Sequence, residues 1–135
     1  MSDCIFCKII KGEIPSQKLY EDAQTYAFLD ITPVNPGHAL VVPKNHSVNI
    51  LDAENKDICA ITETVAKIAP KIIKAVGAGA FNLAVNNGSA AGQVVPHLHF
   101  HIIPRFPDDG RGLWGGKHVG SDELAEVAEK IRKEF

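Results

Sequence analysis

Apolar and β-branched residues gather in short stretches separated by turn residues, and this pattern predicts β-strands. The predicted strands at residues 18–21 and 25–30 form a hairpin with residues 22–24 in its turn, and the strands at 81–85 and 94–103 flank Asn86-Asn87-Gly88. Residues 33–37 are predicted to be a loop. The predicted strands cover residues 18–21, 25–30, 38–43, 81–85 and 94–103.

Apolar positions three and four residues apart predict the helices. The main helix follows Asp52, and Pro70 within it is expected to kink or end it. An apolar turn or helix at residues 4–11 precedes a break at Pro15, and Ser121 is expected to cap a final helix. The apolar positions are Ile58, Ile61, Val65, Ile68 and Ile72 in the main helix, and Leu124, Ala128 and Ile131 in the last one.

Strands that are neighbours in sequence and joined by short turns favour an antiparallel sheet. We therefore expect an α+β fold, with about five strands backed by one main helix and a C-terminal helix, in a single domain over residues 1–135. Five of the eleven glycines lie between residues 110 and 120, which predicts a mobile tail. The sheet leaves an edge that a second copy of the chain would bury, so a symmetric homodimer is expected.

Composition narrows the classes of partner. A net charge of −2 and a pI near 6.3 offer no basic field for long nucleic acid. Residues 1–11 lack the regions of a signal peptide, and no stretch of 18 apolar residues exists, so we expect a soluble cytoplasmic protein without a membrane partner. Three cysteines, two of them close together, argue against a disulfide framework and favour metal or redox use.

His97, His99 and His101 alternate with apolar residues. In a strand, alternate side chains share one face, so the three imidazoles are predicted to form a row while Leu98, Phe100 and Ile102 point into the core. Imidazole changes charge near physiological pH and is costly to hold beside a core. The pattern therefore favours a functional role over a purely structural one.

Strand geometry limits what this row can bind. Positions four residues apart lie about 13 Å apart, whereas zinc needs imidazole nitrogens about 2.0–2.1 Å from the ion. All three rings cannot bind one metal, although two neighbours could, which keeps a zinc hydrolase open as an alternative. Phosphorus chemistry fits better, because one neutral imidazole can attack while a second bonds a phosphate oxygen.

The run from His97 to Ile103 resembles the signature of the histidine-triad (HIT) family. The likeness covers residues 4–106, leaves the glycine-rich tail and last helix at 107–135 loosely matched, and is closest to the Hint-type branch and its bacterial zinc-containing members. It implies a homodimeric nucleotidyl hydrolase or transferase acting on an α-phosphate. The matching segments are Cys4-Ile5-Phe6-Cys7-Lys8-Ile9-Ile10, Ile14-Pro15, Ala27-Phe28-Leu29-Asp30-Ile31, Gly37-His38-Ala39-Leu40-Val41-Val42-Pro43-Lys44-Asn45-His46 and Gly92-Gln93.

The resemblance also implies roles for the histidines. His99 would attack the α-phosphorus and form a covalent nucleotidyl-histidine that water hydrolyses, and a backbone carbonyl bonded to its other nitrogen would fix the useful tautomer. His101 would bond the phosphate or the leaving group. His38 would line the same pocket, its alternative being a core histidine at a strand start.

For the nucleoside, the resemblance implies that Asp30 accepts from both ribose hydroxyls and that Asn86 contacts the phosphate. A turn role is the alternative for both. Trp114 would approach the partner subunit's active site and help to select substrates. The base would lie among apolar side chains whose alternative is plain core filling, namely Phe6, Ile9, Phe28 and Ile31.

One position departs from the family pattern. After Gly92-Gln93 the family commonly has serine or threonine, whereas this chain has Val94. The lost hydroxyl is expected to shift the rate or the leaving-group preference. Backbone N–H groups at Gln93 and Val94 remain candidates to bind phosphate oxygens.

The cysteines predict a second site. Cys4 and Cys7 have zinc-ligand spacing, and His46 and His97 would complete a closed, structural Cys2His2 site, as in some bacterial HIT proteins. A redox pair or two idle buried thiols are the alternatives. Cys59, in the main helix, is interpreted as a small core residue.

The function that the resemblance implies is hydrolysis of purine nucleoside phosphoramidates, or related AMP or GMP conjugates, through His99. Zinc is expected only as a structural ion, with no catalytic metal or organic cofactor. Two alternatives stay open: a dinucleoside polyphosphate hydrolase, and a non-enzymatic nucleotide-binding or scaffold protein.

Overall fold

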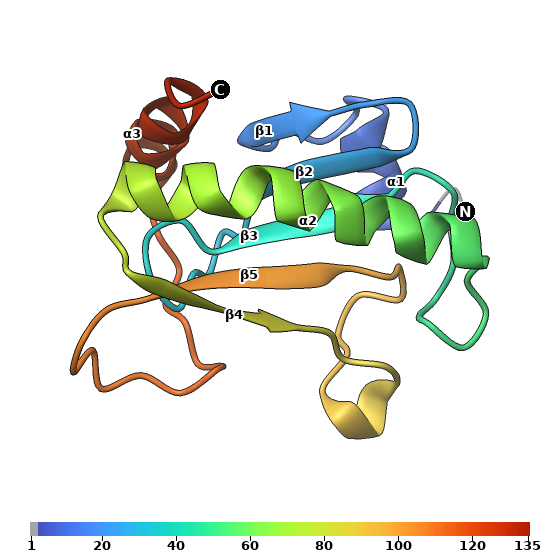
Figure 1. The fold of residues 1–135 in the computed structure, drawn as a ribbon. Coiled ribbons are helices and arrows are strands. Elements are labelled where there is room, and N and C mark those ends of the chain that lie inside the picture. The colour runs from blue at the N-terminus through green and yellow to red at the C-terminus, as the bar shows by residue number, and fades with distance from the viewer. Residues whose placement is uncertain (1–2) are drawn as a thin grey trace.

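A computed structural model describes residues 3–135 and contains one antiparallel sheet with helices on both faces (Figure 1). Residues 1 and 2, which the single-domain prediction includes, lie outside the described part. The strands follow the order β1-β2-β3-β5-β4 across the sheet. Their bounds are Lys18–Glu21 (β1), Thr25–Leu29 (β2), Ala39–Pro43 (β3), Ala80–Ala84 (β4) and Phe100–Arg105 (β5).

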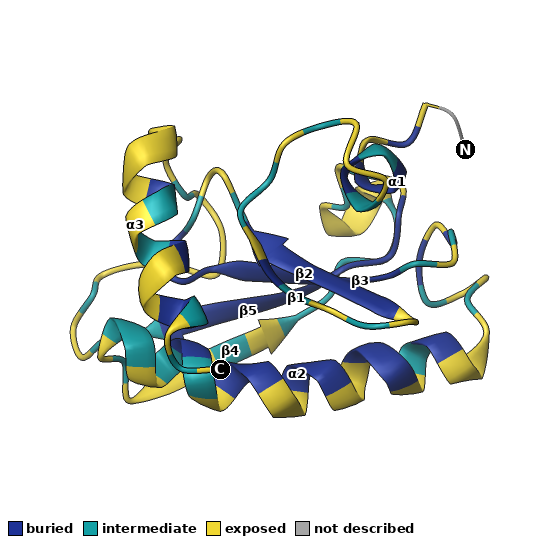
Figure 2. Cartoon of the chain, turned by 90° about the horizontal axis from the view of Figure 1, so that it is seen from above, coloured by how far each residue is buried: buried dark blue, intermediate teal, exposed yellow. Residues whose placement is uncertain are grey.

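Three α-helices surround the sheet: α1 (Ile5–Ile10), α2 (Asn55–Val76) and α3 (Ser121–Arg132). Helix α2 crosses one face, whereas the short α1 lies over the opposite face (Figure 2). A 3-10 turn, η1 (Ser89–Ala91), lies between β4 and β5. The predicted α+β class with five antiparallel strands is confirmed. Within residues 3–135, no helix has the length and apolarity that a membrane crossing requires.

Period-two alternation gives the sheet two different faces. Ala27 and Leu29 pack with the core beneath α2, while Tyr26 and Phe28 pack with α1 on the other face. Leu98, Phe100 and Ile102 belong to the α2 side, as predicted. His101 pairs with Leu40 across the β3–β5 ladder and therefore shares the α1 face.

Strand β5 begins later than predicted, at Phe100 instead of Val94. Pro96 has no N–H to donate, and the N–H of His97 turns back to the carbonyl of Val95 at 2.9 Å, so residues 94–99 form no ladder. Only His101 of the histidine row is a strand residue. The apolar residues between the histidines still pack beneath α2, because Leu98 N–H bonds to the carbonyl of Ser47 at 2.8 Å.

Two predictions about the helices are wrong, and one alternative of a third is excluded. Pro70 does not end α2, which continues to Val76, because Pro70 is exposed and the Ala66 carbonyl that it leaves unbonded faces solvent. Gly120 is the N-cap of α3, and Ser121 is its first helical residue. Cys59 is exposed rather than buried, since it lies on the solvent side of α2.

The glycine-rich segment is packed, not a free tail. Val119 N–H bonds to the carbonyl of Ile31 at 3.1 Å. A Cβ at Gly116 would overlap the backbone of Thr32 and Pro33, so only glycine allows this close approach. The segment is thereby held against the loop that follows β2.

Candidate active site

A cavity of about 690 Å³ opens on the face of the sheet that α1 only partly covers. Helix α1 forms one wall, β2 and the loop after it form the floor, and the segment after β5 forms the far rim. Apart from Gln93, every residue predicted for catalysis or substrate binding lines it: Phe6, Ile9, Phe28, Asp30, Ile31, His38, Asn86, Val94, His99, His101 and Trp114.

The geometry fixes the tautomer of His99. Its Nδ1 lies 2.7 Å from the carbonyl oxygen of His97, and a carbonyl only accepts, so Nδ1 carries the proton. In the neutral ring, Nε2 is then an unprotonated lone pair. The edge of Phe6 packs against this imidazole at 5.1 Å between centroids and 90° between planes, which holds its orientation.

A second chain of hydrogen bonds fixes His38 and His101. Val34 N–H donates to His38 Nδ1 at 3.0 Å, so in the neutral ring the proton lies on Nε2. His38 Nε2 donates in turn to His101 Nδ1 at 3.0 Å. This leaves the proton of His101 on its own Nε2, as a donor available to a ligand.

Burial keeps these three rings neutral at pH 7. Burial lowers the pKa of His38 and of His99 below the ordinary histidine value. Burial, reinforced by the neighbouring His99 and His38, lowers the pKa of His101 to about 3. The site therefore combines one unprotonated nitrogen with one N–H donor, and neither ring carries a charge.

Asp30 is held by a turn immediately after β2. Its Oδ1 accepts from the backbone N–H and the hydroxyl of Thr32, at 2.8 and 3.0 Å. Its Oδ2 lies 3.5 Å from His38 Nε2 at the cavity. One carboxylate oxygen is thus fixed by the chain, while the other has acceptor capacity for a ligand.

Gln93 lies outside the cavity, contrary to expectation. Its Nε2 donates to the carbonyls of Val48 and Val95, its Oε1 accepts from Gly88 N–H, and its own N–H bonds to the Gly88 carbonyl. Gln93 therefore braces the loop after η1. The adjacent Val94 lines the cavity, and 89% of its surface is exposed.

Two further predicted residues line the same cavity. Asn86 lines it and donates to the Gly92 carbonyl at 3.4 Å. Trp114 lies edge-on to His101 of the same chain, with ring centroids 4.8 Å apart. The packed glycine-rich segment brings it there.

The four predicted metal ligands converge beside the cavity, with all ligand atoms within 4.8 Å of one another. Cys4 Sγ and Cys7 Sγ lie 3.3 and 3.6 Å from His97 Nδ1, and His46 Nδ1 lies 3.2 Å from His97 Nδ1 and 3.5 Å from Cys7 Sγ. A tetrahedral zinc ion requires about 3.3–3.8 Å between neighbouring ligand atoms. The donor set therefore fits zinc in both chemistry and spacing.

Hydrogen bonds from neighbouring groups also orient these predicted ligands. His97 Nε2 donates to the carbonyl of Pro43 at 2.9 Å, which leaves Nδ1 as a lone pair directed at both sulfurs. Helix α1 places Cys4 at its N-cap and Cys7 one turn later, where Cys7 N–H bonds to Cys4 Sγ at 3.4 Å. Such closed sites hold structural rather than catalytic zinc.

A second cluster, Asp30, His38 and His101, also has ligand atoms within 4.8 Å of one another. However, His38 Nδ1 accepts from Val34, so Nε2 would have to lose its proton, giving an imidazolate, before it could bind a metal. The cluster is therefore a hydrogen-bonded relay, and the geometry disfavours the zinc-hydrolase alternative.

Two residues that orient side chains of the site were not predicted from the sequence. Thr32 orients Asp30, and the Asp-x-Thr spacing is a recognisable turn signal. Val34 orients His38 through a backbone N–H, which any non-proline residue would supply. Residue types carry no signal for such a contact.

The chain is similar in sequence to proteins of named activity. An adenylylsulfatase of Arabidopsis thaliana is 44% identical over 133 residues, which is 98% of this chain and 64% of that protein. An adenosine 5'-monophosphoramidase of Candida albicans is 42% identical over 141 residues, covering 99% of this chain and 92% of that protein.

The fold agrees as well. A zinc-bound histidine triad family protein from Mycobacterium smegmatis matches with a TM-score of 0.83 at 30% identity, covering 98% of this chain and 93% of that chain. The HIT domain matches residues 11–108. With its histidines, cavity and sheet arranged in this way, the chain belongs to the HIT family.

Proposed function

We propose that this HIT-family hydrolase cleaves purine nucleoside phosphoramidates and related AMP or GMP conjugates at the α-phosphate. The observation that carries the proposal is the bond from His99 Nδ1 to the His97 carbonyl, which leaves an unprotonated Nε2 beside the cavity. Relatives named as adenosine 5'-monophosphoramidase and adenylylsulfatase support a nucleotide substrate with a variable leaving group.

The reaction proceeds in two displacements. His99 Nε2 attacks the α-phosphorus, the phosphorus–nitrogen bond breaks, and the leaving amine takes a proton from solvent water, while the neutral His101 donates a hydrogen bond from Nε2 to the phosphate. Water then attacks the nucleotidyl-histidine and loses a proton to solvent, and the bond between phosphorus and His99 breaks to release the nucleoside monophosphate. His38 supports both steps through its bond to His101 Nδ1.

The cavity suits a nucleoside. Phe6 and Phe28 lie edge to face, 5.4 Å apart, and with Ile9 and Ile31 they offer apolar walls to the base. Asp30 lines the cavity, and its Oδ2, which Thr32 leaves free, would accept from the ribose hydroxyls. Asn86 lies at the phosphate end, and Trp114 covers the leaving-group side of His101.

A trapping experiment tests this function. Brief incubation with an adenosine phosphoramidate, followed by acid-free mass spectrometry of peptides, should give an adenylyl adduct on His99. His99→Ala should lose the adduct and turnover but keep AMP binding. Faster cleavage of diadenosine polyphosphates than of the phosphoramidate would favour the polyphosphate alternative, and AMP binding without any turnover by the wild type would favour a binding protein.

For the metal, we propose that Cys4, Cys7, His46 and His97 bind one structural zinc ion. When bound, zinc would cross-link α1 to the segment before β5. Because the carbonyl of His97 also holds His99, the same residue connects the metal site to the nucleophile. Elemental analysis of purified protein should give one zinc per chain, and its absence would refute the site.

We also propose that the chain forms a homodimer through β4. This strand lies at an edge of the sheet and exposes Phe81 and Leu83 by 37% and 46%, an apolar edge that a second copy would bury. Sedimentation equilibrium tests this arrangement: the wild type should sediment as a dimer, and Leu83→Lys should sediment as a monomer.

A further inference from the structure

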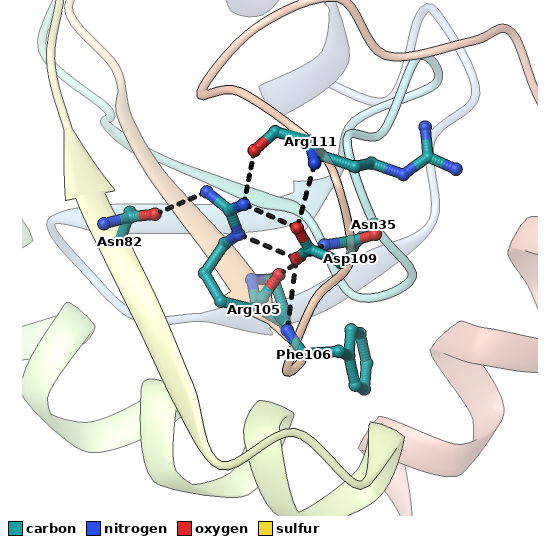
Figure 3. Close-up of polar contacts among 7 residues, drawn as sticks. Asn35, Asn82, Arg105, Phe106, Asp109 and Arg111 are labelled. Atoms are coloured by element: carbon teal, nitrogen blue, oxygen red, sulfur yellow. Dashed lines mark hydrogen bonds and ion pairs between the residues drawn. The ribbon is translucent and has the colours of Figure 1, made fainter.

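A cluster of polar side chains lies outside the cavity lining, where β5 ends (Figure 3). Arg105 binds Asp109 through two parallel hydrogen bonds, Nε to Oδ2 at 2.9 Å and Nη2 to Oδ1 at 2.7 Å. The side chains are only 24% and 10% exposed. This bidentate, sheltered geometry is the strong form of an ion pair, and we name it the Arg105–Asp109 clamp.

The clamp fixes the segment that leads to Trp114. Asp109 accepts from the backbone N–H of Phe106 at 3.2 Å and of Arg111 at 3.0 Å, while Arg105 also donates to the Arg111 carbonyl. Asn82 of β4 accepts from Arg105 Nη1 at 3.0 Å, so the clamp is attached to the sheet (Figure 3). The chain is therefore anchored three residues before Trp114.

A second anchor lies just after Trp114. Gly116 packs against the backbone of Thr32 and Pro33, and Val119 bonds to Ile31. Trp114 itself is 44% exposed, yet its ring lies 4.8 Å from that of His101. The position of the Trp114 ring therefore depends on the clamp before it and on the contacts of Gly116 and Val119 after it.

The clamp also contacts the loop around His38. Asn35 Nδ2 donates to Asp109 Oδ2 at 2.9 Å and to the Pro104 carbonyl at 3.0 Å. The Asn35 carbonyl accepts from His38 N–H at 3.1 Å, and the preceding residue, Val34, donates to His38 Nδ1. The Asp109 carboxylate therefore bonds both to the loop around His38 and to the segment that leads to Trp114.

We propose that the Arg105–Asp109 clamp is a positioning device for the active site, which holds Trp114 against His101 and the loop of residues 34–38 around His38. The expected effect of the clamp on kcat rests on the function proposed above, whereas its expected effect on the position of Trp114 does not. Neither clamp residue lines the cavity, so both act through the groups that they hold.

The experiment uses Trp114, the chain's single tryptophan, as a reporter. Asp109→Asn keeps the shape of the side chain but removes the charge and presents an N–H to Arg105. Full release of the half-exposed ring should raise acrylamide quenching of its fluorescence about twofold. On an adenosine phosphoramidate, kcat should fall about 10- to 100-fold, with little change in AMP affinity.

Glu134→Gln is the matched control. It removes a carboxylate that pairs with Lys74 at 3.3 Å in the last turn of α2 and takes no part in the hydrogen bonds of the clamp. It should change neither the quenching nor kcat. Arg105→Lys, which keeps the charge but loses the fork, should give intermediate values, and it replaces Asp109→Asn if that variant does not fold.

Unchanged quenching and kcat in a folded clamp variant would overturn the proposal. A loss of kcat that matches only the unfolded fraction, measured by circular dichroism, would also overturn it. If the wild type has no nucleotidyl transfer activity but Asp109→Asn still releases Trp114, the clamp stands as a positioning device and the proposed function fails.

Discussion

Replacing His38 by asparagine or by glutamine separates the two hydrogen bonds of this buried ring. Asparagine places its amide oxygen where Nδ1 accepts from Val34, but it is too short to reach His101. Glutamine places its amide nitrogen near the position of Nε2 and donates to His101, but it offers Val34 no acceptor. Both variants lose the ring, so the loss of packing is broadly shared.

The expected effects are of different kinds. In His38→Gln the N–H of Val34, a residue only 3% exposed, loses its partner, which costs about 1–3 kcal/mol of unfolding free energy. For a chain of this length that corresponds to a fall of about 3–12 °C in Tm. In His38→Asn the His101 tautomer is no longer fixed, and kcat should fall about 10- to 100-fold.

Thermal unfolding and single-turnover cleavage of an adenosine phosphoramidate measure the two effects separately. We expect a crossed result: His38→Asn is the more stable and less active variant, and His38→Gln is the less stable and more active one. If activity follows stability in both variants, or if His38→Asn is the more active, the relay from Val34 through His38 to His101 is refuted.

Three further predictions concern the metal, the departure at Val94 and pH. Cys7→Ser should lower the zinc content and reduce Tm by about 10 °C. A variant with the same zinc content and the same Tm as the wild type would refute the structural site. Val94→Ser restores a hydroxyl at the cavity rim and should raise kcat/KM on phosphoramidates about two- to tenfold, so an equal or lower value argues against that contact. Because burial lowers the pKa of His38 and of His99 and brings that of His101 to about 3, kcat/KM should persist as the pH falls through the ordinary histidine pKa of 6.5 and drop only at lower pH, once the rings gain protons. An acid limb centred near the ordinary histidine pKa of 6.5 would contradict burial as the dominant effect.

Local periodicity was enough to predict the layers of the fold. Alternation around Leu98 and Phe100 and the helical spacing around Ile61 depend only on neighbours along the chain, and both apolar sets pack in one core. The same rules misjudged the start of β5 and the end of α2. There, Pro96 prevents a ladder that the alternation suggested, and α2 continues past Pro70 because Pro70 lies on its exposed side.

Residue types and spacing, with the family resemblance, indicated which side chains would gather at the cavity and at the metal site. The tertiary structure alone decided how they are connected: Val34 sets the His38 tautomer, Gln93 braces a loop, and the Arg105–Asp109 clamp suspends Trp114 over its own chain's His101. Val34, Gln93 and the Asp109 carboxylate make these connections through backbone N–H and carbonyl groups, which every non-proline residue carries. Their partners are therefore chosen by three-dimensional packing and leave no pattern in the sequence.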